Sequence, residues 1–242
     1  NIVIPAFAVG RTQELLYYIK RFLVNGTVPG LEKVPVYIDS PLGIKATRIY
    51  AGCGADCYDD ETKALARSGD LFEFDSLHIA ETVEQSMEIN ELTGCNIIIS
   101  ASGMCEAGRI RHHLKNNLYK ANATVVFVGY QAVGTLGRII IDGAKKVKIL
   151  GVQVIINATI KQIEGFSGHA DQSELLEWVS EIPETPKKIF LVHGRQQAAD
   201  IRASLKRLIF AATELLSAEP DRAKDMEEDI GGLADRMEKL VK

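Results

Sequence analysis

Short apolar runs that end in a turn and are followed by a helical pattern recur along this chain of 242 residues. The clearest runs cover residues 1–5, 34–39, 96–100 and 123–129. An apolar run of this kind is typical of a buried strand, and alternation of strand and helix is typical of a parallel sheet. The pattern therefore predicts an α/β fold whose strands are joined through turns and helices.

Two of the five histidines stand where an apolar or small-residue run gives way to a polar segment, in residues 165–172 and 191–194. An apolar strand is expected to present His193 at its carboxyl end, and His169 opens a turn before a helix that Asp171 can cap. The strands of such a βαβ unit bind ligands at their carboxyl ends. Imidazole there suits zinc, although a strand-end histidine with a structural hydrogen bond is the more common case.

Three turns between a predicted strand and a helix carry groups that can face a phosphate. Ser40 precedes Pro41 at a helix start, Ser102 follows the third apolar run, and Gly134 and Thr135 follow the fourth. Backbone N–H groups at such turns attract phosphate, and glycine permits close approach. Ser40 can equally serve as a helix cap, and the Gly134–Thr135 turn matches neither a P-loop nor a dinucleotide fingerprint. The turns predict phosphate contacts without fixing the ligand.

Six segments follow one another in the order of a known family's motifs. They are IPAFAVGR (4–11), VYIDSPL (36–42), ASGMCEAGR (101–109), VGYQAVGTLGR (128–138), GFSGHADQ (165–172) and LVHG (191–194). As a set they resemble the metallo-β-lactamase-fold nucleases of the beta-CASP group, specifically the bacterial and archaeal relatives of mRNA 3′-end processing endonucleases. Gly168 stands where the family usually has Ala, and Arg195 where it usually has Glu. Arg195 puts a positive charge beside the histidine that the resemblance assigns to zinc.

The resemblance implies a Rossmann-like parallel-sheet beta-CASP domain and the C-terminal portion of a metallo-β-lactamase fold. It implies that His193 is a ligand in a two-zinc site, and that His169 lies beside the scissile phosphate as proton donor or phosphate anchor. The His-x-His-x-Asp-His zinc motif that family members carry upstream does not occur in this sequence. We therefore expect the chain to be part of a longer protein and to be inactive as a ribonuclease alone.

Changes in sequence character predict three domains. They are a beta-CASP-like α/β domain at 1–150, the C-terminal part of the lactamase fold at 151–208, and a helical tail at 209–242. Residues 145–150 and 152–160 alternate around Gly151 like an antiparallel pair, which supports the first boundary. The tail predicts amphipathic helices that pack on the body or on a second copy, so a homodimer is one expected assembly.

Two further clusters of polar residues carry no expected metal chemistry. The acidic residues 59–61 are typical of a helix start. His112 and His113 point to different faces of a predicted helix and cannot easily bind one ion together. At most one of them is expected to reach a cleft, with a phosphate contact or surface exposure rather than metal binding.

The composition limits RNA binding to a local surface. A net charge of −4 and a pI near 5.8 exclude a generally basic protein, so any RNA contact requires a local basic cleft. The four cysteines fit neither a zinc-finger spacing nor a disulfide framework, which indicates free thiols in a reducing cytoplasm. No apolar run approaches the roughly 18 residues of a membrane span, so no membrane contact is expected.

The leading hypothesis is a metal-dependent RNA phosphodiesterase. In it the chain supplies the RNA-binding and active-site-completing part of a zinc-dependent ribonuclease that acts on single-stranded RNA in processing or decay. The rival hypothesis is a non-catalytic RNA- or nucleotide-binding module whose histidines are structural. A Rossmann-type enzyme is disfavoured because no Gly-x-Gly-x-x-Gly follows a predicted strand.

Overall fold

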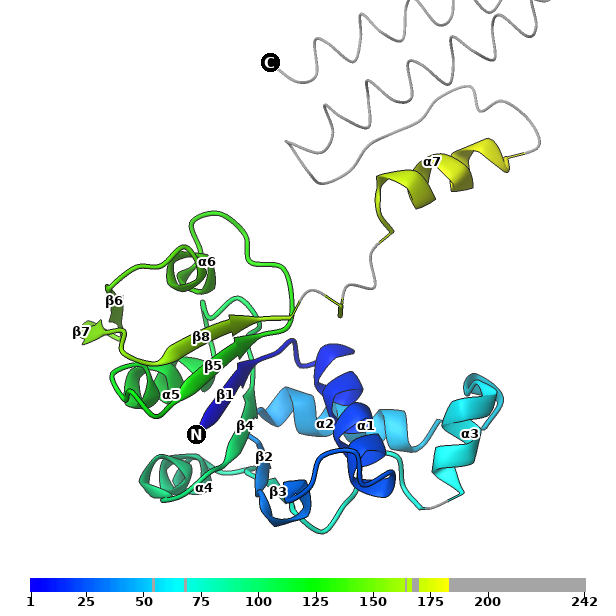
Figure 1. Cartoon of the computed structure of the whole chain (residues 1–242), viewed down its shortest axis with the longest axis horizontal. Helices are drawn as coiled ribbons and strands as arrows, with labels where there is room; N and C mark the ends of the chain where they lie inside the picture. Colours follow the sequence, from blue (N-terminus) through cyan, green and yellow to red (C-terminus); the bar gives the residue numbers. More distant parts are fainter. Residues whose placement is uncertain (54, 68, 164, 167–169, 183–242) are drawn as a thin grey trace, which may run out of the picture. The chain divides into compact units, whose positions relative to one another are not determined.

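The computed structural model describes residues 1–182 apart from 54, 68, 164 and 167–169. The chain divides into two compact units, Asn1–Ser167 and Gly168–Lys242. A six-stranded sheet with the order β3-β2-β4-β1-β5-β8 forms the centre of the first unit, and every pair of neighbouring strands is parallel (Figure 1). The predicted α/β fold with a parallel sheet is confirmed.

The strands and helices follow the alternation in the sequence. The strands are β1 (Ile2–Pro5), β2 (Val36–Ile38), β3 (Leu77–Ile79), β4 (Ile97–Ser100), β5 (Thr124–Phe127), β6 (Lys146–Ile149), β7 (Val152–Ile155) and β8 (Thr159–Gln162). The α-helices are α1 (Arg11–Val24), α2 (Pro41–Ala51), α3 (Asp60–Ala66), α4 (Val83–Glu88), α5 (Ile110–Asn117), α6 (Leu136–Ile141) and α7 (Gln172–Ser180). Short 3₁₀ turns are η1 (Leu31–Lys33), η2 (Ala55–Cys57) and η3 (Ile89–Glu91).

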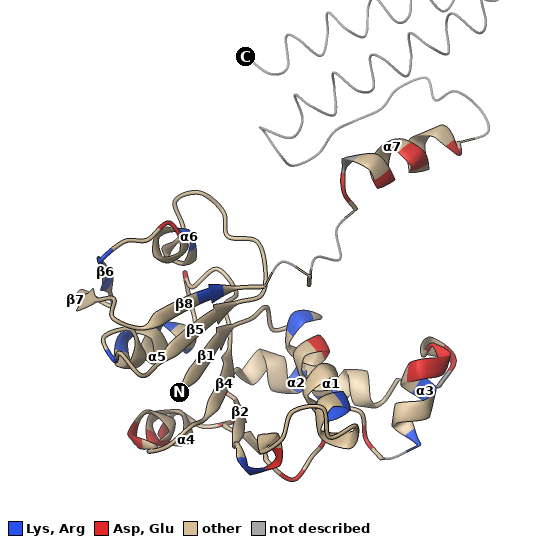
Figure 2. Ribbon diagram, in the orientation of Figure 1, with Lys and Arg blue, Asp and Glu red and all other residues tan. Residues whose placement is uncertain are grey.

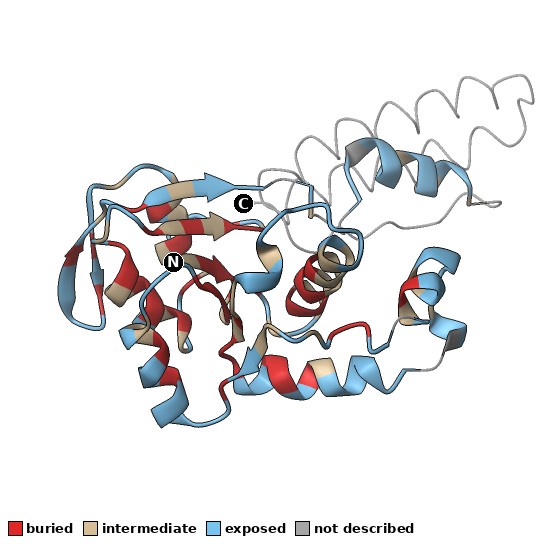
Figure 3. Cartoon of the chain, turned by 60° about the horizontal axis from the view of Figure 1, so that its bottom comes forward, coloured by how far each residue is buried: buried red, intermediate tan, exposed pale blue. Residues whose placement is uncertain are grey.

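The centre of the sheet is buried on both faces because successive side chains of its central strands, such as β1 and β4, enter different cores (Figure 3). In β1, Val3 packs in one core and Ile4 in the other. In β4, Ile98 shares the core of Val3, and Ile99 shares that of Ile4. Strands buried in this way need apolar residues at consecutive positions, which explains why they appear in the sequence as unbroken apolar runs.

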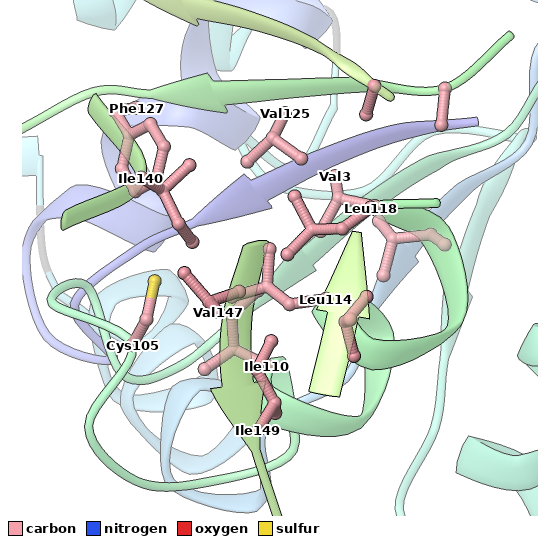
Figure 4. Close-up of a cluster of buried hydrophobic side chains, with 14 of the residues drawn as sticks. Val3, Cys105, Ile110, Leu114, Leu118, Val125, Phe127, Ile140, Val147 and Ile149 are labelled. Atoms are coloured by element: carbon pink, nitrogen blue, oxygen red, sulfur yellow. The ribbon is translucent and has the colours of Figure 1, made fainter. Parts of the chain in front are cut away.

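The helices divide between the two faces according to their apolar residues. Leu16 of α1 and Ile44 of α2 belong to the core of Ile4. Leu114 of α5 and Ile140 of α6 belong to the core of Val3, which Figure 4 shows together with side chains of β5 and β6. The result is a sheet between two helical layers, with the carboxyl ends of the parallel strands at one edge.

An antiparallel hairpin, β6–β7, packs beside α5 and α6. Its connection consists of Leu150 and Gly151, both with positive φ (50° and 81°), which is the backbone of a type I′ turn. The predicted antiparallel pair around Gly151 is therefore confirmed for these two strands. The next strand, β8, instead pairs in parallel with β5. The first compact unit thus continues to Ser167, and the division of the chain at residue 150 stays a prediction.

Side-chain caps begin several helices where the sequence indicated. Asp59 accepts a hydrogen bond from the Thr62 N–H at 2.7 Å, so the acidic residues 59–61 form a helix start. In the second unit, Asp171 caps α7, as predicted, and also forms a capping box with Glu174. None of the helices in the described ranges is long and apolar enough to cross a membrane. The tail at 209–242 lies outside the described residues.

Candidate functional site

Four loops lie at the carboxyl ends of the parallel strands. They are residues 6–10 after β1, 39–40 after β2, 101–109 after β4 and 128–135 after β5. Because the strands run in the same direction, these loops meet at one edge of the sheet, which we call the loop edge. Ligands bind at this edge in open α/β sheets, so the loop edge is the candidate functional site.

Two buried glutamines join the loops of the loop edge to one another. The Gln13 side chain donates to the Ala8 carbonyl oxygen after β1, and to the Gly43 carbonyl oxygen and Thr47 Oγ1 of α2. The Gln131 side chain donates to the Gly103 carbonyl oxygen at 2.8 Å and so joins the loops after β4 and β5. These hydrogen bonds hold the loops in one arrangement. Neither glutamine was predicted from the sequence as a site residue.

The loop after β4 makes a sharp turn that requires glycine. Gly108 has φ of 79°, and a Cβ atom there would lie 2.3 Å from the Ala101 carbonyl oxygen. The Ser102 hydroxyl closes the same turn, since it lies 3.2 Å from both the N–H and the carbonyl oxygen of Ala107. Ser102 is therefore part of the loop framework and is only half-buried.

The other predicted phosphate-facing residues lie in different surroundings. Ser40 is buried, and its Oγ accepts the Gly43 N–H at 3.1 Å as the N-cap of α2. Thr135 is half-buried, and its Oγ1 donates to the Ala132 carbonyl oxygen and accepts the Arg138 N–H. A phosphate near Ser40 would therefore meet backbone N–H groups of α2 more readily than this hydroxyl.

Gly134 offers the most open backbone of the predicted residues. It is exposed, has φ of 89°, and has no atom within 4 Å of where a Cβ would stand. Within the described residues, its N–H makes no backbone hydrogen bond. An anion can therefore approach this N–H without displacing another group.

A buried ionic cluster lies beneath the loop edge. The Asp39 carboxylate, fully buried after β2, accepts hydrogen bonds from Arg109 Nη1 at 2.7 Å and Ser86 Oγ at 2.6 Å, and lies 2.5 Å from His113 Nε2. The Ser100 hydroxyl donates to the Asp39 carbonyl oxygen at 2.7 Å. The cluster thus connects the ends of β2 and β4 with α4 and α5.

Hydrogen bonding keeps Asp39 ionised despite its burial. Burial alone raises the pKa of this carboxyl, but hydrogen bonds from His113, Ser86 and Arg109 outweigh it and hold the pKa below its ordinary value. Arg109 also donates to the carbonyl oxygens of Ala80 and Glu81, so the guanidinium fixes the chain after β3. The Asp39 carboxylate therefore holds the chain segments beneath the loop edge together through its hydrogen bonds to Ser86, Arg109 and His113.

The prediction for His113 was wrong, because its side chain is fully buried and faces neither solvent nor a phosphate site. Its second ring nitrogen, Nδ1, lies 3.2 Å from Asn90 Oδ1. His112 is exposed, as expected. Helical periodicity predicted that His112 and His113 lie on different faces of α5. It could not show that His113 faces the buried Asp39 carboxylate.

The predicted catalytic and metal-binding histidines, His169 and His193, lie outside the described residues. The start of the segment 165–172 lies within the described residues. Its Phe166 ring packs edge-on against Tyr18 of α1, with ring centroids 5.6 Å apart. The Arg11 guanidinium lies 5.2 Å from the centre of the Phe166 ring. This segment therefore begins beside the first turns of α1.

Zinc, which the family resemblance implies, needs several ligands around one point. Within the described ranges, no group of three or more His, Cys, Asp or Glu side chains could hold a metal ion. The described residues therefore do not form a zinc site on their own.

Two models of known protein families match this chain. A model of the Beta-Casp domain matches residues 12–140, which include strands β2 to β5 of the parallel sheet and the loops after β2, β4 and β5. The chain belongs to the beta-CASP family of metallo-β-lactamase-fold nucleases. A second model, described as the Zn-dependent metallo-hydrolase RNA specificity domain, matches residues 153–209. The resemblance inferred from the motifs is confirmed, and zinc and RNA are supported at the level of the family.

Known beta-CASP relatives are similar over most of this chain. Ribonuclease TTHA0252 of Thermus thermophilus is 36% identical over 198 residues, 81% of this chain and 44% of that protein. Transcription termination factor FttA of Methanosarcina mazei is 31% identical over 222 residues, 89% of this chain and 34% of that protein. FttA of Methanothermobacter thermautotrophicus is 35% identical over 214 residues, 86% of this chain and 33% of that protein. The chain spans less than half the length of these relatives.

Proposed function

We propose that this chain is the RNA-binding and active-site-completing part of a zinc-dependent ribonuclease that hydrolyses phosphodiester bonds in RNA processing or decay. The observation that carries the proposal is the loop edge, where family motifs after β1, β2, β4 and β5 meet at the carboxyl ends of one sheet. Single-stranded RNA is the proposed ligand, with phosphates at the loops of Ser40, Ser102, Gly134 and Thr135. A cytoplasmic location accompanies this function.

The two motif histidines have separate proposed tasks. His193 is the proposed zinc ligand in a two-zinc site whose other ligands come from sequence outside this chain. His169 is the proposed proton donor to the leaving oxygen, or an anchor for the scissile phosphate, because imidazole titrates near neutral pH. Zinc, when bound, would supply an activated hydroxide and charge neutralisation at the phosphate.

The purified 242-residue chain is expected to bind RNA but not to cleave it. Most ligands of the family's zinc motif are absent from its sequence, so it should take up zinc only weakly. Metal analysis after dialysis and a cleavage assay with end-labelled RNA test this expectation. A longer protein that includes the upstream zinc motif is the positive control. Tight stoichiometric zinc together with RNA hydrolysis by the isolated chain would contradict the proposal.

Replacing Thr135 by valine is expected to weaken single-stranded RNA binding by about 1 kcal/mol, the usual contribution of one hydrogen bond. Ser40→Ala is the matched variant, because both hydroxyls cap a helix but Ser40 is buried. Loss of the Ser40 cap should lower the free energy of unfolding by about 1 kcal/mol. It should change RNA affinity only if the start of α2 moves. Fluorescence anisotropy with labelled oligouridine, paired with thermal unfolding, separates the effects. An RNA affinity unchanged by Thr135→Val in a folded protein would refute the contact.

The rival function, a non-catalytic RNA- or nucleotide-binding module, has one observation in its favour, namely that the described residues contain no metal-binding group of three. The longer protein distinguishes the two functions. Zinc-dependent cleavage there supports the ribonuclease, whereas RNA binding without cleavage at any zinc concentration supports the binding module.

A further inference from the structure

A pocket with basic walls lies next to the loop edge, lined by residues of α5, α6, β6 and the loop after β4. It has a volume of about 400 Å³, within the range of small-molecule sites, and Arg111, Lys146 and Lys148 line it. We call it the basic pocket. Figure 2 shows the positive residues of β6 and α5 in this part of the first unit.

The three cations of the basic pocket are not neutralised by carboxylates. Within the described residues, none of them forms an ion pair. Glu106 is the acidic residue in the wall, and its Oε1 accepts the Leu136 N–H at 2.5 Å. In a protein with a net charge of −4, three unpaired cations around one cavity mark a place where an anion is favoured.

The structure holds these cations in place through the fold. Lys146 and Lys148 alternate along β6 with Val147 and Ile149, whose side chains are buried in the core. This alternation directs both lysines away from the core. Arg111, on the first turn of α5, donates from Nη1 to the Glu106 carbonyl oxygen at 3.4 Å. Its Nε is buried and has no hydrogen-bond partner, so the wall retains an unsatisfied donor.

The rest of the wall suits a ligand that carries an apolar ring beside its charge. Leu136 and Val147 line the pocket together with Ile139, which is 43% exposed. Gly134, the open glycine of the loop edge, also belongs to the wall. A strand of nucleotides that touches the Gly134 turn therefore reaches the basic pocket without leaving the surface.

We propose that the basic pocket binds a phosphate-bearing nucleotide, as a second contact for the RNA strand beyond the loop edge. The choice of RNA as the strand rests on the proposed function, whereas the preference for a nucleotide phosphate rests on the pocket's own residues. The pocket extends the RNA footprint along α6 toward the β6–β7 hairpin.

The first arm of the test measures RNA affinity of the full chain by fluorescence anisotropy with labelled oligouridine. Lys146→Ala/Lys148→Ala should bind about tenfold more weakly, and the slope of log affinity against log salt should become shallower by roughly 1.4, since each lost phosphate contact on a single strand removes about 0.7. The matched control is Lys33→Ala/Lys120→Ala, which removes two lysines that precede β2 and β5 and do not line the pocket. The control should bind RNA like the unaltered chain.

The second arm titrates the ¹⁵N-labelled unaltered chain with adenosine monophosphate and follows the amide shifts. Shifts at Gly134, Lys146 and Lys148 support the pocket. An effect on RNA affinity without such shifts identifies an RNA strand as the ligand, and shifts without an effect on RNA affinity identify a free nucleotide. Absence of both overturns the proposal.

The two arms also separate this inference from the proposed function. If the unaltered chain binds no RNA while the monophosphate shifts the pocket amides, the proposed function fails and the pocket stands. If both double variants bind RNA as tightly as the unaltered chain and no amide shifts occur, only the proposal for the basic pocket fails. Spectra of the lysine variants show whether the fold is retained.

Discussion

Asp39→Ala is expected to destabilise the unit Asn1–Ser167 by about 3–5 kcal/mol, the usual effect of removing one partner of a buried ion pair. The change leaves Arg109 without its carboxylate and takes a hydrogen-bond partner from both Ser86 and His113, which are buried. The free energy of unfolding in urea measures the effect. Asp59→Ala is the control, because Asp59 is exposed and its loss removes only a surface helix cap, which should lower the free energy of unfolding less. Similar decreases in the free energy of unfolding in both variants would show that the buried cluster contributes no more to stability than a surface helix cap.

The same cluster predicts a pH dependence of stability. The pKa of Asp39 is lower in the folded state than its ordinary value of 3.8, so its stabilising contribution is complete above that pH. The contribution is lost as the pH falls below 3.8 through the folded-state pKa. Asp39→Asn cannot titrate at this position, so its stability should fall less steeply over the same acid range. Parallel curves for the two proteins would contradict the assignment.

His169→Ala, in a longer protein that carries the zinc motif, is expected to lower turnover by a factor on the order of 10² to 10⁴ while leaving zinc in place. His193→Ala should instead lose zinc and activity together, because an imidazole bond to the ion disappears. Zinc content and the rate of RNA cleavage, measured on the same preparations, distinguish the two histidines. His112→Ala is the control, since His112 is exposed on α5 and should change neither quantity.

Other outcomes for the histidine variants have clear meanings. Equal loss of zinc in His169→Ala and His193→Ala would make His169 a ligand or the support of one. Full activity in both variants would remove the basis for assigning ribonuclease chemistry to these motifs.

The alternation of strands and helices could be predicted because the central strands of the sheet, such as β1 and β4, are buried on both faces. Burial of that kind leaves continuous apolar runs such as the one at Ile97–Ser100, and these are visible without knowledge of the neighbours. Helix starts were equally accessible, since a cap such as Ser40 or Asp171 depends on residues within one turn. The order of the strands was not accessible, because the pairing of β1 with both β4 and β5 joins residues far apart in the sequence.

The cluster around Asp39 was missed for the same reason. Its hydrogen-bond partners Ser86, Arg109 and His113 are 47 to 74 residues away, so no local spacing connects them. In the sequence alone, nothing distinguishes the buried His113 from the exposed His112 beside it. A signal was present in the sequence, namely an acidic residue at the end of an apolar run, but only the fold shows which side chains neutralise it.

The contact between Gln131 and Gly137 restricts how this sequence can diverge. A Cβ atom on residue 137 would lie 1.8 Å from Gln131 Oε1, so a larger residue there is excluded while glutamine keeps its position. Shortening residue 131 would make room but would also remove the hydrogen bond to Gly103 that joins two loops. The two positions are therefore expected to change together among beta-CASP proteins, so that this helix glycine depends on its glutamine partner.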